Sequence, residues 1–181
     1  MHLPCVPFRG MKNQWVFGQC SLQPLMQHQV VSYRQSMDVM LFDKVRRLNL
    51  PPGDFAIFGS GPLAIRGIIP VCNDLDILCR RKAWEIVRSM GKIEFLPEYD
   101  VTVASMCEHT LTFGTVWGIG DFDVDELIDT AEIISGLPFV QLEHVIRYKK
   151  IRFSEKDSLH LDALAALRQT NRQALVDNKL Q

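Results

Sequence analysis

The sequence has no long apolar run and almost no net charge. Its 181 residues carry 20 Lys and Arg against 21 Asp and Glu, a formal charge of −1. A chain with this balance has no general attraction to nucleic acid or to anionic membranes. No stretch approaches the ~20 apolar residues of a membrane-spanning helix, and residues 1–18 lack the apolar core of a secretory signal. Any contact with a polyanion must therefore come from a local patch, and no membrane partner is expected.

Cysteine and histidine patterns that bind zinc are also missing. The five cysteines are an odd number without the spacing of zinc ligands, and the five histidines are scattered along the chain. Hydrophobic residues make up 47% and charged residues 23%, which are ordinary values for a globular protein. We therefore expect a soluble cytoplasmic protein that is long enough to form a packed core.

Periodicity divides the chain into an irregular arm and one domain. Residues 1–24 mix Pro, Gly and Gln without sustained periodicity, which predicts a tail or an irregular arm. Residues 25–181 are predicted to form one domain, with an N-terminal helix at 27–48, a core at 53–140 and closing helices at 141–176. The first helix is long and amphipathic, so it could cover a neighbouring molecule in a homodimer.

The core alternates short strands and helices. The pattern predicts a helix at 81–90, strands at 92–96, 101–106 and 111–117, a helix at 125–135, an extended piece at 138–140, and closing helices at 142–150 and 157–176. The acidic run from Asp121 to Asp129 lacks the glycine and glutamate of a calcium loop, so we interpret it as a helix start. The mixture favours an α/β (α+β) fold, with a small mixed twisted sheet and flanking helices.

The stretch 55–80 carries the main functional signal. Phe55–Phe58 is a continuous apolar run, which is typical of a buried strand. Gly59, Ser60 and Gly61 then allow a sharp turn and a close approach of the backbone to another group. Ser60 is predicted to cap a short helix that has Pro62 early in it and ends at Gly67.

Two aspartates follow on the next predicted strand. In Asp74-Leu75-Asp76 the two-residue period of a strand puts both carboxylates on one face, with Leu75 on the other. Neighbouring carboxylates repel each other unless a cation or a proton lies between them. An exposed strand end with solvated charges is the plainer alternative. The position directly after a Gly-Ser turn favours a divalent-metal site beside a phosphate-sized hole.

These residues resemble the nucleotidyltransferase superfamily of the polymerase-beta type, and more narrowly small bacterial abortive-infection-type nucleotidyltransferase proteins. The matching pattern is Gly59-Ser60, a short helix at 62–66, and Asp74-Leu75-Asp76. A weaker match follows downstream, at Gly136–Val140, Leu142-Glu143, Tyr148-Lys149 and Glu155-Lys156-Asp157. Together the matches extend over residues 55–167.

The resemblance implies an enzyme that moves a nucleoside monophosphate from a nucleoside triphosphate to a hydroxyl of a small molecule, protein or RNA. Asp74 and Asp76 would be catalytic and would hold Mg²⁺ or Mn²⁺. The nucleotide-binding residues implied are Gly59, Ser60, Gly61, Arg66 and Lys149, with Lys156 as a further cation. Outside that role, Lys149 would be an ordinary solvated helix lysine, and Lys156-Asp157 a charge pair at a helix start.

One feature of the superfamily is not found. Active members normally add a third carboxylate from a later strand, but the predicted strand 111–117 contains no acid. Glu108 lies before it, and Asp121 and Asp123 lie after it. An alternative function is therefore a catalytically inactive binding or regulatory module with the same fold, as in a toxin–antitoxin-like pair. A glycosyltransferase that uses Asp-x-Asp is disfavoured, because few residues precede the acids.

Overall fold

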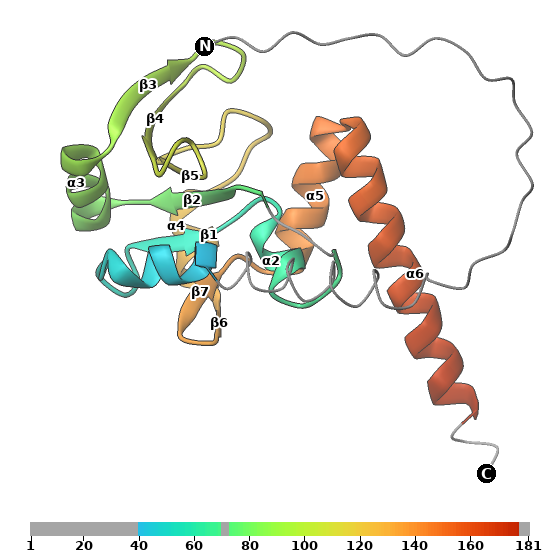
Figure 1. Cartoon of the computed structure of the whole chain (residues 1–181). Helices are drawn as coiled ribbons and strands as arrows, with labels where there is room; N and C mark the ends of the chain where they lie inside the picture. Colours follow the sequence, from blue (N-terminus) through green and yellow to red (C-terminus); the bar gives the residue numbers. More distant parts are fainter. Residues whose placement is uncertain (1–39, 70–72, 178–181) are drawn as a thin grey trace, which may run out of the picture.

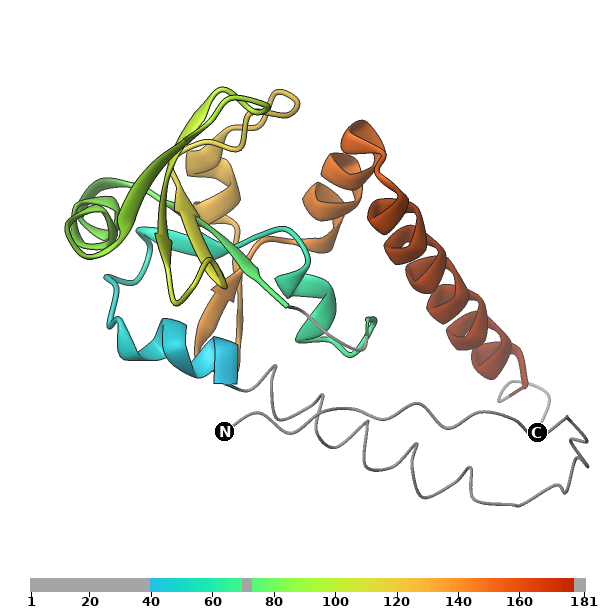
Figure 2. The same cartoon turned by 45° about the horizontal axis from the view of Figure 1, so that its top comes forward.

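Residues 40–69 and 73–177 of the chain are described by a computed structural model, and they form one mixed sheet with helices around it (Figures 1 and 2). The sheet has seven strands in the order β3-β4-β5-β2-β1-β7-β6. The strands are β1 (Phe55–Ile57), β2 (Leu75–Cys79), β3 (Lys92–Leu96), β4 (Val101–Met106), β5 (Leu111–Gly114), β6 (Glu132–Ile134) and β7 (Leu137–Phe139). The helices are α2 (Gly61–Ala64), α3 (Arg81–Met90), α4 (Val124–Asp129), α5 (Leu142–Arg152) and α6 (Glu155–Asp177).

The centre of the sheet is built from apolar strands. All residues of β1 and β7 are buried, and β2 is buried except at Asp76, which is half-buried. β1 runs antiparallel to β2 and parallel to β7, while β2 runs parallel to β5. Such continuous apolar runs need cover on both faces of the sheet. The predicted α/β class with a small mixed sheet is therefore confirmed.

Most predicted elements are found near their expected bounds. The strands at 55–58, 92–96 and 101–106 and the helix at 81–90 are confirmed. The strand predicted at 111–117 is shorter and ends at Gly114. Of the predicted helix 27–48, residues 40–47 are helical, and the part before residue 40 lies outside the described residues, as does the arm at 1–24.

The helix predicted at 125–135 is wrong in its second half. α4 ends at Asp129, and β6 and β7 then form an antiparallel hairpin in which Ile134 pairs with Leu137. The two residues between these strands, Ser135 and Gly136, have φ values of 49° and 77°. A two-residue hairpin turn of this kind needs positive φ at both positions. Gly136 therefore closes a strand turn, where the sequence analysis expected the end of a helix.

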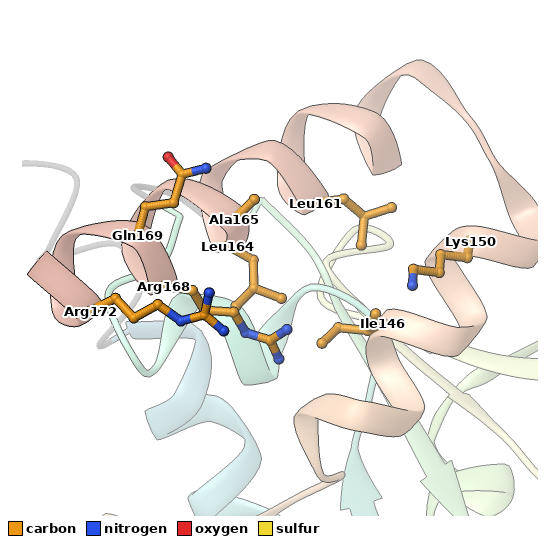
Figure 3. A pocket seen from close by; sticks show the side chains of 8 residues that line it. All are labelled: Ile146, Lys150, Leu161, Leu164, Ala165, Arg168, Gln169 and Arg172. Atoms are coloured by element: carbon orange, nitrogen blue, oxygen red, sulfur yellow. The ribbon is translucent and has the colours of Figure 1, made fainter.

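The two closing helices pack against each other beside the sheet (Figures 1 and 2). Between them lies a groove lined by side chains of both (Figure 3). α6 begins with a capping box, because the Ser154 backbone N–H donates to Asp157 Oδ2 (3.2 Å) and the Asp157 N–H donates to Ser154 Oγ (3.2 Å). The predicted helix start at Lys156-Asp157 is confirmed. α6 then continues well past the end of α5, with 23 residues against 11.

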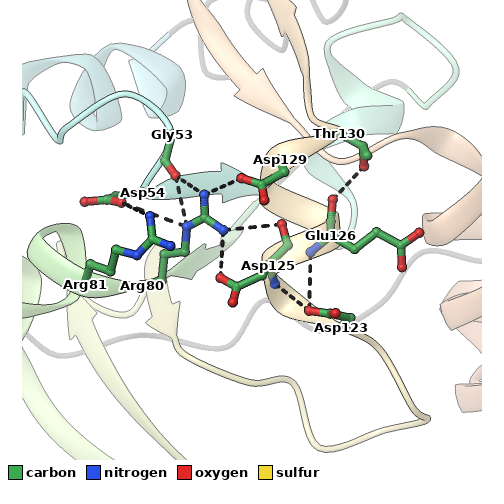
Figure 4. A network of polar contacts seen from close by, with 9 residues as sticks. All are labelled: Gly53, Asp54, Arg80, Arg81, Asp123, Asp125, Glu126, Asp129 and Thr130. Atoms are coloured by element: carbon green, nitrogen blue, oxygen red, sulfur yellow. Dashed lines mark hydrogen bonds and ion pairs between the residues drawn. The ribbon is translucent and has the colours of Figure 1, made fainter.

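The acidic run after β5 caps α4 and binds Arg80, a partly buried arginine (Figure 4). Asp123 caps α4, and its Oδ1 accepts the backbone N–H groups of Asp125 (2.9 Å) and Glu126 (3.3 Å). Arg80 at the end of β2 donates to the Gly53 carbonyl (2.7 Å) and to the carboxylates of Asp125 (2.7 Å) and Asp129. The helix-start interpretation of the acidic run is therefore confirmed, and Arg80 joins α4 to the loop before β1.

Candidate functional site

The two aspartates of the Asp-x-Asp pattern line one pocket. Asp76 lies in β2. Asp74 immediately precedes this strand, and the buried Leu75 separates the two aspartates. The pocket has a volume of about 200 Å³. Its other lining residues are Leu96, Tyr99, Val101, Thr112, Trp117, Tyr148 and Arg152. The alternation of β2 thus brings both carboxylates to the same pocket, as the sequence predicts.

Asp76 is electrostatically strained when it is ionised. Burial, and secondly the neighbouring Asp74 carboxylate, raise the pKa of Asp76 from 3.8 to about 6. Arg152, Lys156 and Lys149 oppose this rise but do not cancel it. A cation bound between the carboxylates would relieve both causes. Perturbed acids in pockets are more common at functional sites than elsewhere.

The turn after β1 lies directly against Asp76. Gly59 has φ +62°, and a Cβ placed on it would overlap Asp76 Oδ2. The predicted close approach of the backbone is therefore found, with the Asp76 carboxylate as the group approached. Ser60 is buried but its side chain makes no cap hydrogen bond, so the predicted capping by its hydroxyl is wrong. Gly61 packs against Ile57, where a side chain would not fit.

Arg66 is not brought to the carboxylate pocket. Its guanidinium donates to the Pro62 carbonyl (2.7 Å) and to the Glu132 carboxylate (2.5 Å), and it does not line the pocket. Arg66 therefore ties the end of α2 to β6. This arrangement leaves the nucleotide-binding role expected from the resemblance without geometric support.

Lys149 is buried in an ion cluster. Its side chain is 1% exposed, and its Nζ donates to Asp157 Oδ1 (3.1 Å), a carboxylate that is itself 0% exposed. Arg152 binds the same carboxylate with two hydrogen bonds of 2.6 Å, and the Ser154 hydroxyl adds a third of 2.6 Å. The interpretation of Lys149 as a solvated helix lysine is therefore wrong. Lys149 supports Asp157, which in turn fixes Arg152 at the pocket.

Burial and hydrogen bonds shift the pKa values of Asp157 and Lys149 in opposite directions. Burial alone would raise the pKa of Asp157, but hydrogen bonds from Arg152, Ser154 and Lys149 outweigh it and hold the pKa below its ordinary value. Burial also lowers the pKa of Lys149, and Asp157 opposes that change. Removing one member would leave its partners buried and unpaired, which is strongly destabilising.

Two cations, Lys156 and Arg152, bring positive charge to the carboxylate pocket. Lys156 Nζ lies 3.4 Å from Asp74 Oδ1. Arg152 lines the pocket, and its guanidinium lies 5.2 Å from the centre of the Tyr148 ring. Burial raises the pKa of Tyr148 to about 12. The sequence analysis names Tyr148 only as part of the downstream match, without a role, and it does not name Arg152, although Arg152 follows Lys149 at helical spacing and could have been found from that signal.

None of the three candidate acids completes the site. Asp123 caps α4, and Asp121 lines a different pocket. Glu108 belongs to the turn between β4 and β5 and does not line the carboxylate pocket. Over residues 40–69 and 73–177, no group of three or more His, Cys, Asp or Glu is placed to hold a metal ion. The pair Asp74 and Asp76 has no third carboxylate in this part of the chain.

Thr112 occupies the position beside Asp76 in the neighbouring strand. β2 and β5 run parallel, and Asp76 is the register partner of Thr112. Side chains at paired positions point to the same face of the sheet. A carboxylate at this position would lie beside Asp76, and the chain has a hydroxyl there instead.

Known proteins provide no assignment. No protein-family model, no curated protein and no solved structure matches the chain. The resemblance to nucleotidyltransferases therefore rests on the sequence patterns alone, mainly Gly59-Ser60 and Asp74-Leu75-Asp76. No helix in the described part of the chain is long and apolar enough to cross a membrane.

The donor set fits a magnesium or manganese ion that arrives with a polyphosphate. Mg²⁺ is usually held by one or two carboxylates together with phosphate oxygens and water. Asp74 and Asp76 supply the carboxylates, and Thr112 adds a hydroxyl to the same pocket. Arg152 and Lys156 supply the charge that a triphosphate would need. These are the residues that could hold a metal ion together with a polyphosphate chain.

Proposed function

We propose that this protein is a metal-dependent nucleotidyltransferase, which moves a nucleoside monophosphate from a nucleoside triphosphate to a hydroxyl acceptor. The observation that supports this most is the meeting of Asp74 and Asp76 in one pocket with Arg152. The backbone of Gly59 lies against the same carboxylate. The resemblance of the Gly-Ser turn and the Asp-x-Asp strand to the superfamily supports the same function.

The charged residues at the pocket and next to it each have a role in this proposal. Asp74 and Asp76 would hold Mg²⁺ or Mn²⁺, which when bound neutralises phosphate charge and activates the attacking hydroxyl. With a pKa of about 6, Asp76 is roughly nine-tenths ionised at pH 7 and can accept a cation. Arg152 and Lys156 would bind the phosphates, and the buried pair of Lys149 and Asp157 would keep Arg152 in position.

Binding of non-hydrolysable nucleoside triphosphates tests the site. Calorimetry with analogues of ATP, GTP, CTP and UTP is expected to show binding in Mg²⁺ or Mn²⁺ that is lost in EDTA. Asp76→Asn should weaken binding at least ~10-fold, because one of two metal-binding carboxylates is removed. Asp162→Asn, an exposed position on α6, is the matched control and should bind normally. Equal affinity with and without metal would count against the proposal.

The inactive module remains the second candidate, and Thr112 is the observation that favours it. A hydroxyl stands where a third carboxylate would be expected beside Asp76. Transfer of label from the α-phosphate to small-molecule, protein or RNA acceptors separates the two functions. Metal-dependent nucleotide binding without transfer to any of these acceptors would support a binding or regulatory module.

We place the activity in the cytoplasm. Within the described residues, Cys79 and Cys107 are free thiols, as a reducing compartment would keep them. Cys79 is the buried last residue of β2, and burial raises its pKa to about 12. Imaging of a tagged full-length chain, or fractionation of cells, would test the location.

A further inference from the structure

The groove between α5 and α6 has an apolar floor. It has a volume of about 360 Å³, and its floor is formed by Ile146, Leu161, Leu164 and Ala165 (Figure 3). On α5, helical spacing puts Ile146 on the opposite face from Tyr148 and Arg152, which line the carboxylate pocket. The groove is therefore a second site, separate from the one that would bind nucleotide.

The rim of this groove carries positive charge only. Lys150, Arg168 and Arg172 are exposed, Gln169 is the remaining lining residue, and no carboxylate lines the groove. Arg168 and Arg172 are four residues apart on α6 and both project into the groove (Figure 3). Like charges at this spacing destabilise an isolated helix. In the described part of the chain, no ion pair joins any of these three cations to another residue. An anionic ligand would remove this repulsion.

The shape of the groove indicates a helical ligand with apolar side chains. Apolar side chains and the small Ala165 form its floor. A nucleic-acid backbone would place polar sugar and phosphate groups on this apolar floor, which is unfavourable. α6 extends past the end of α5, so several turns of a third helix can lie along it. Grooves of this kind bind amphipathic helices through apolar anchors spaced three and four residues apart.

The charge of the chain's own ends argues against an internal ligand. Residues 1–39 contain Arg9, Lys12 and Arg34 against one acid, Asp38, and residues 178–181 add Lys179. These segments carry the same sign of charge as the rim. A partner protein with an acidic helix is electrostatically complementary instead.

We infer that the groove between α5 and α6 binds an acidic amphipathic helix of a partner protein. The apolar face of that helix packs on Leu161, Leu164 and Ala165, and its carboxylates pair with Lys150, Arg168 and Arg172. The groove and the carboxylate pocket use different faces of α5, so this binding does not depend on the proposed nucleotidyltransferase activity.

Two synthetic peptides provide the test. Both are labelled 18-residue helices with the same Leu and Ala stripe, and their polar faces carry Glu in one and Lys in the other. Fluorescence anisotropy with the full chain should show the Glu peptide binding at least ~10-fold more tightly than the Lys peptide. Arg168→Glu combined with Arg172→Glu should reverse this preference, because the rim then carries the opposite charge. Ala165→Glu should weaken the Glu peptide by filling and charging the floor.

Controls separate this site from general effects of charge. Lys82→Glu combined with Arg88→Glu changes the net charge by the same amount on exposed positions of α3, and should leave the preference for the Glu peptide unchanged. Circular dichroism checks that each variant is folded. The inference is overturned if the wild type binds neither peptide, if it does not distinguish them, or if the α3 control has the same effect. Displacement of the Glu peptide by single-stranded RNA at lower concentrations would equally overturn it in favour of a polyanion site.

Discussion

Asp76→Asn should make the unliganded protein more stable at neutral pH. The rise in the pKa of Asp76 from 3.8 to about 6 means that its ionised form destabilises the folded state. At 1.36 kcal/mol per pKa unit, the full difference is about 3 kcal/mol above pH 6, and solvent screening at this half-buried position reduces it to about 1–2 kcal/mol. Asparagine keeps the shape of the side chain without the charge, so it removes this destabilisation.

The sign of the pH dependence distinguishes this cause from a change in packing. Protons bind folded Asp76 more tightly than unfolded Asp76, so the penalty is full above about pH 6 and disappears as the pH falls towards 3.8. Urea unfolding of wild type and Asp76→Asn should therefore show a gap of about 1–2 kcal/mol at pH 7.5 that closes by about pH 4. Asp162→Asn is the control and should show no such gap. A variant that is less stable than wild type at pH 7.5, or a gap independent of pH, would show that the charge of Asp76 does not destabilise the folded state.

Three further changes, Gly59→Ala with Gly67→Ala as its control, Asp157→Asn and Thr112→Asp, test neighbouring parts of the site. Gly59→Ala and Gly67→Ala both put alanine at a positive φ, at a cost of about 1–2 kcal/mol. Only Gly59→Ala presses on Asp76, so it alone should also weaken nucleotide binding in calorimetry. Asp157→Asn should lower the free energy of unfolding by about 3–5 kcal/mol in urea titrations, because Lys149 and Arg152 lose their buried partner; a loss below 1 kcal/mol would contradict this. Thr112→Asp should raise the affinity for Mn²⁺ at least ~10-fold by adding a third negative charge beside Asp76, and unchanged affinity would show that the two side chains do not share a ligand.

The sequence predicts those parts of the fold that depend on the local order of apolar and polar residues. Continuous apolar residues indicated β1, and strand alternation put Asp74 and Asp76 at one pocket. The hairpin of β6 and β7 was missed because Ser135-Gly136 after apolar residues also fits the end of a helix. β7 also pairs with the distant strand β1, and that pairing is not visible in a local window of the sequence.

The site was predicted only in part, for the same reason. The burial of Lys149 depends on Asp157 in the next helix, and the position of Arg66 depends on Glu132, 66 residues away. Neither partner can be chosen from the spacing of charges in one segment. The place of Thr112 beside Asp76 depends on the register of two parallel strands, which becomes known only when the sheet is assembled.

Binding of Mn²⁺ measured by electron paramagnetic resonance is the direct test of a metal–nucleotide site at Asp74 and Asp76. The hydrated ion gives a signal that is lost when it is bound, and the titration is made with a non-hydrolysable nucleoside triphosphate present. The wild-type chain is expected to bind one or two Mn²⁺ ions beyond those held by the nucleotide alone. Asp76→Asn should remove that additional binding. Identical titrations for wild type and Asp76→Asn would contradict a metal–nucleotide site at Asp74 and Asp76.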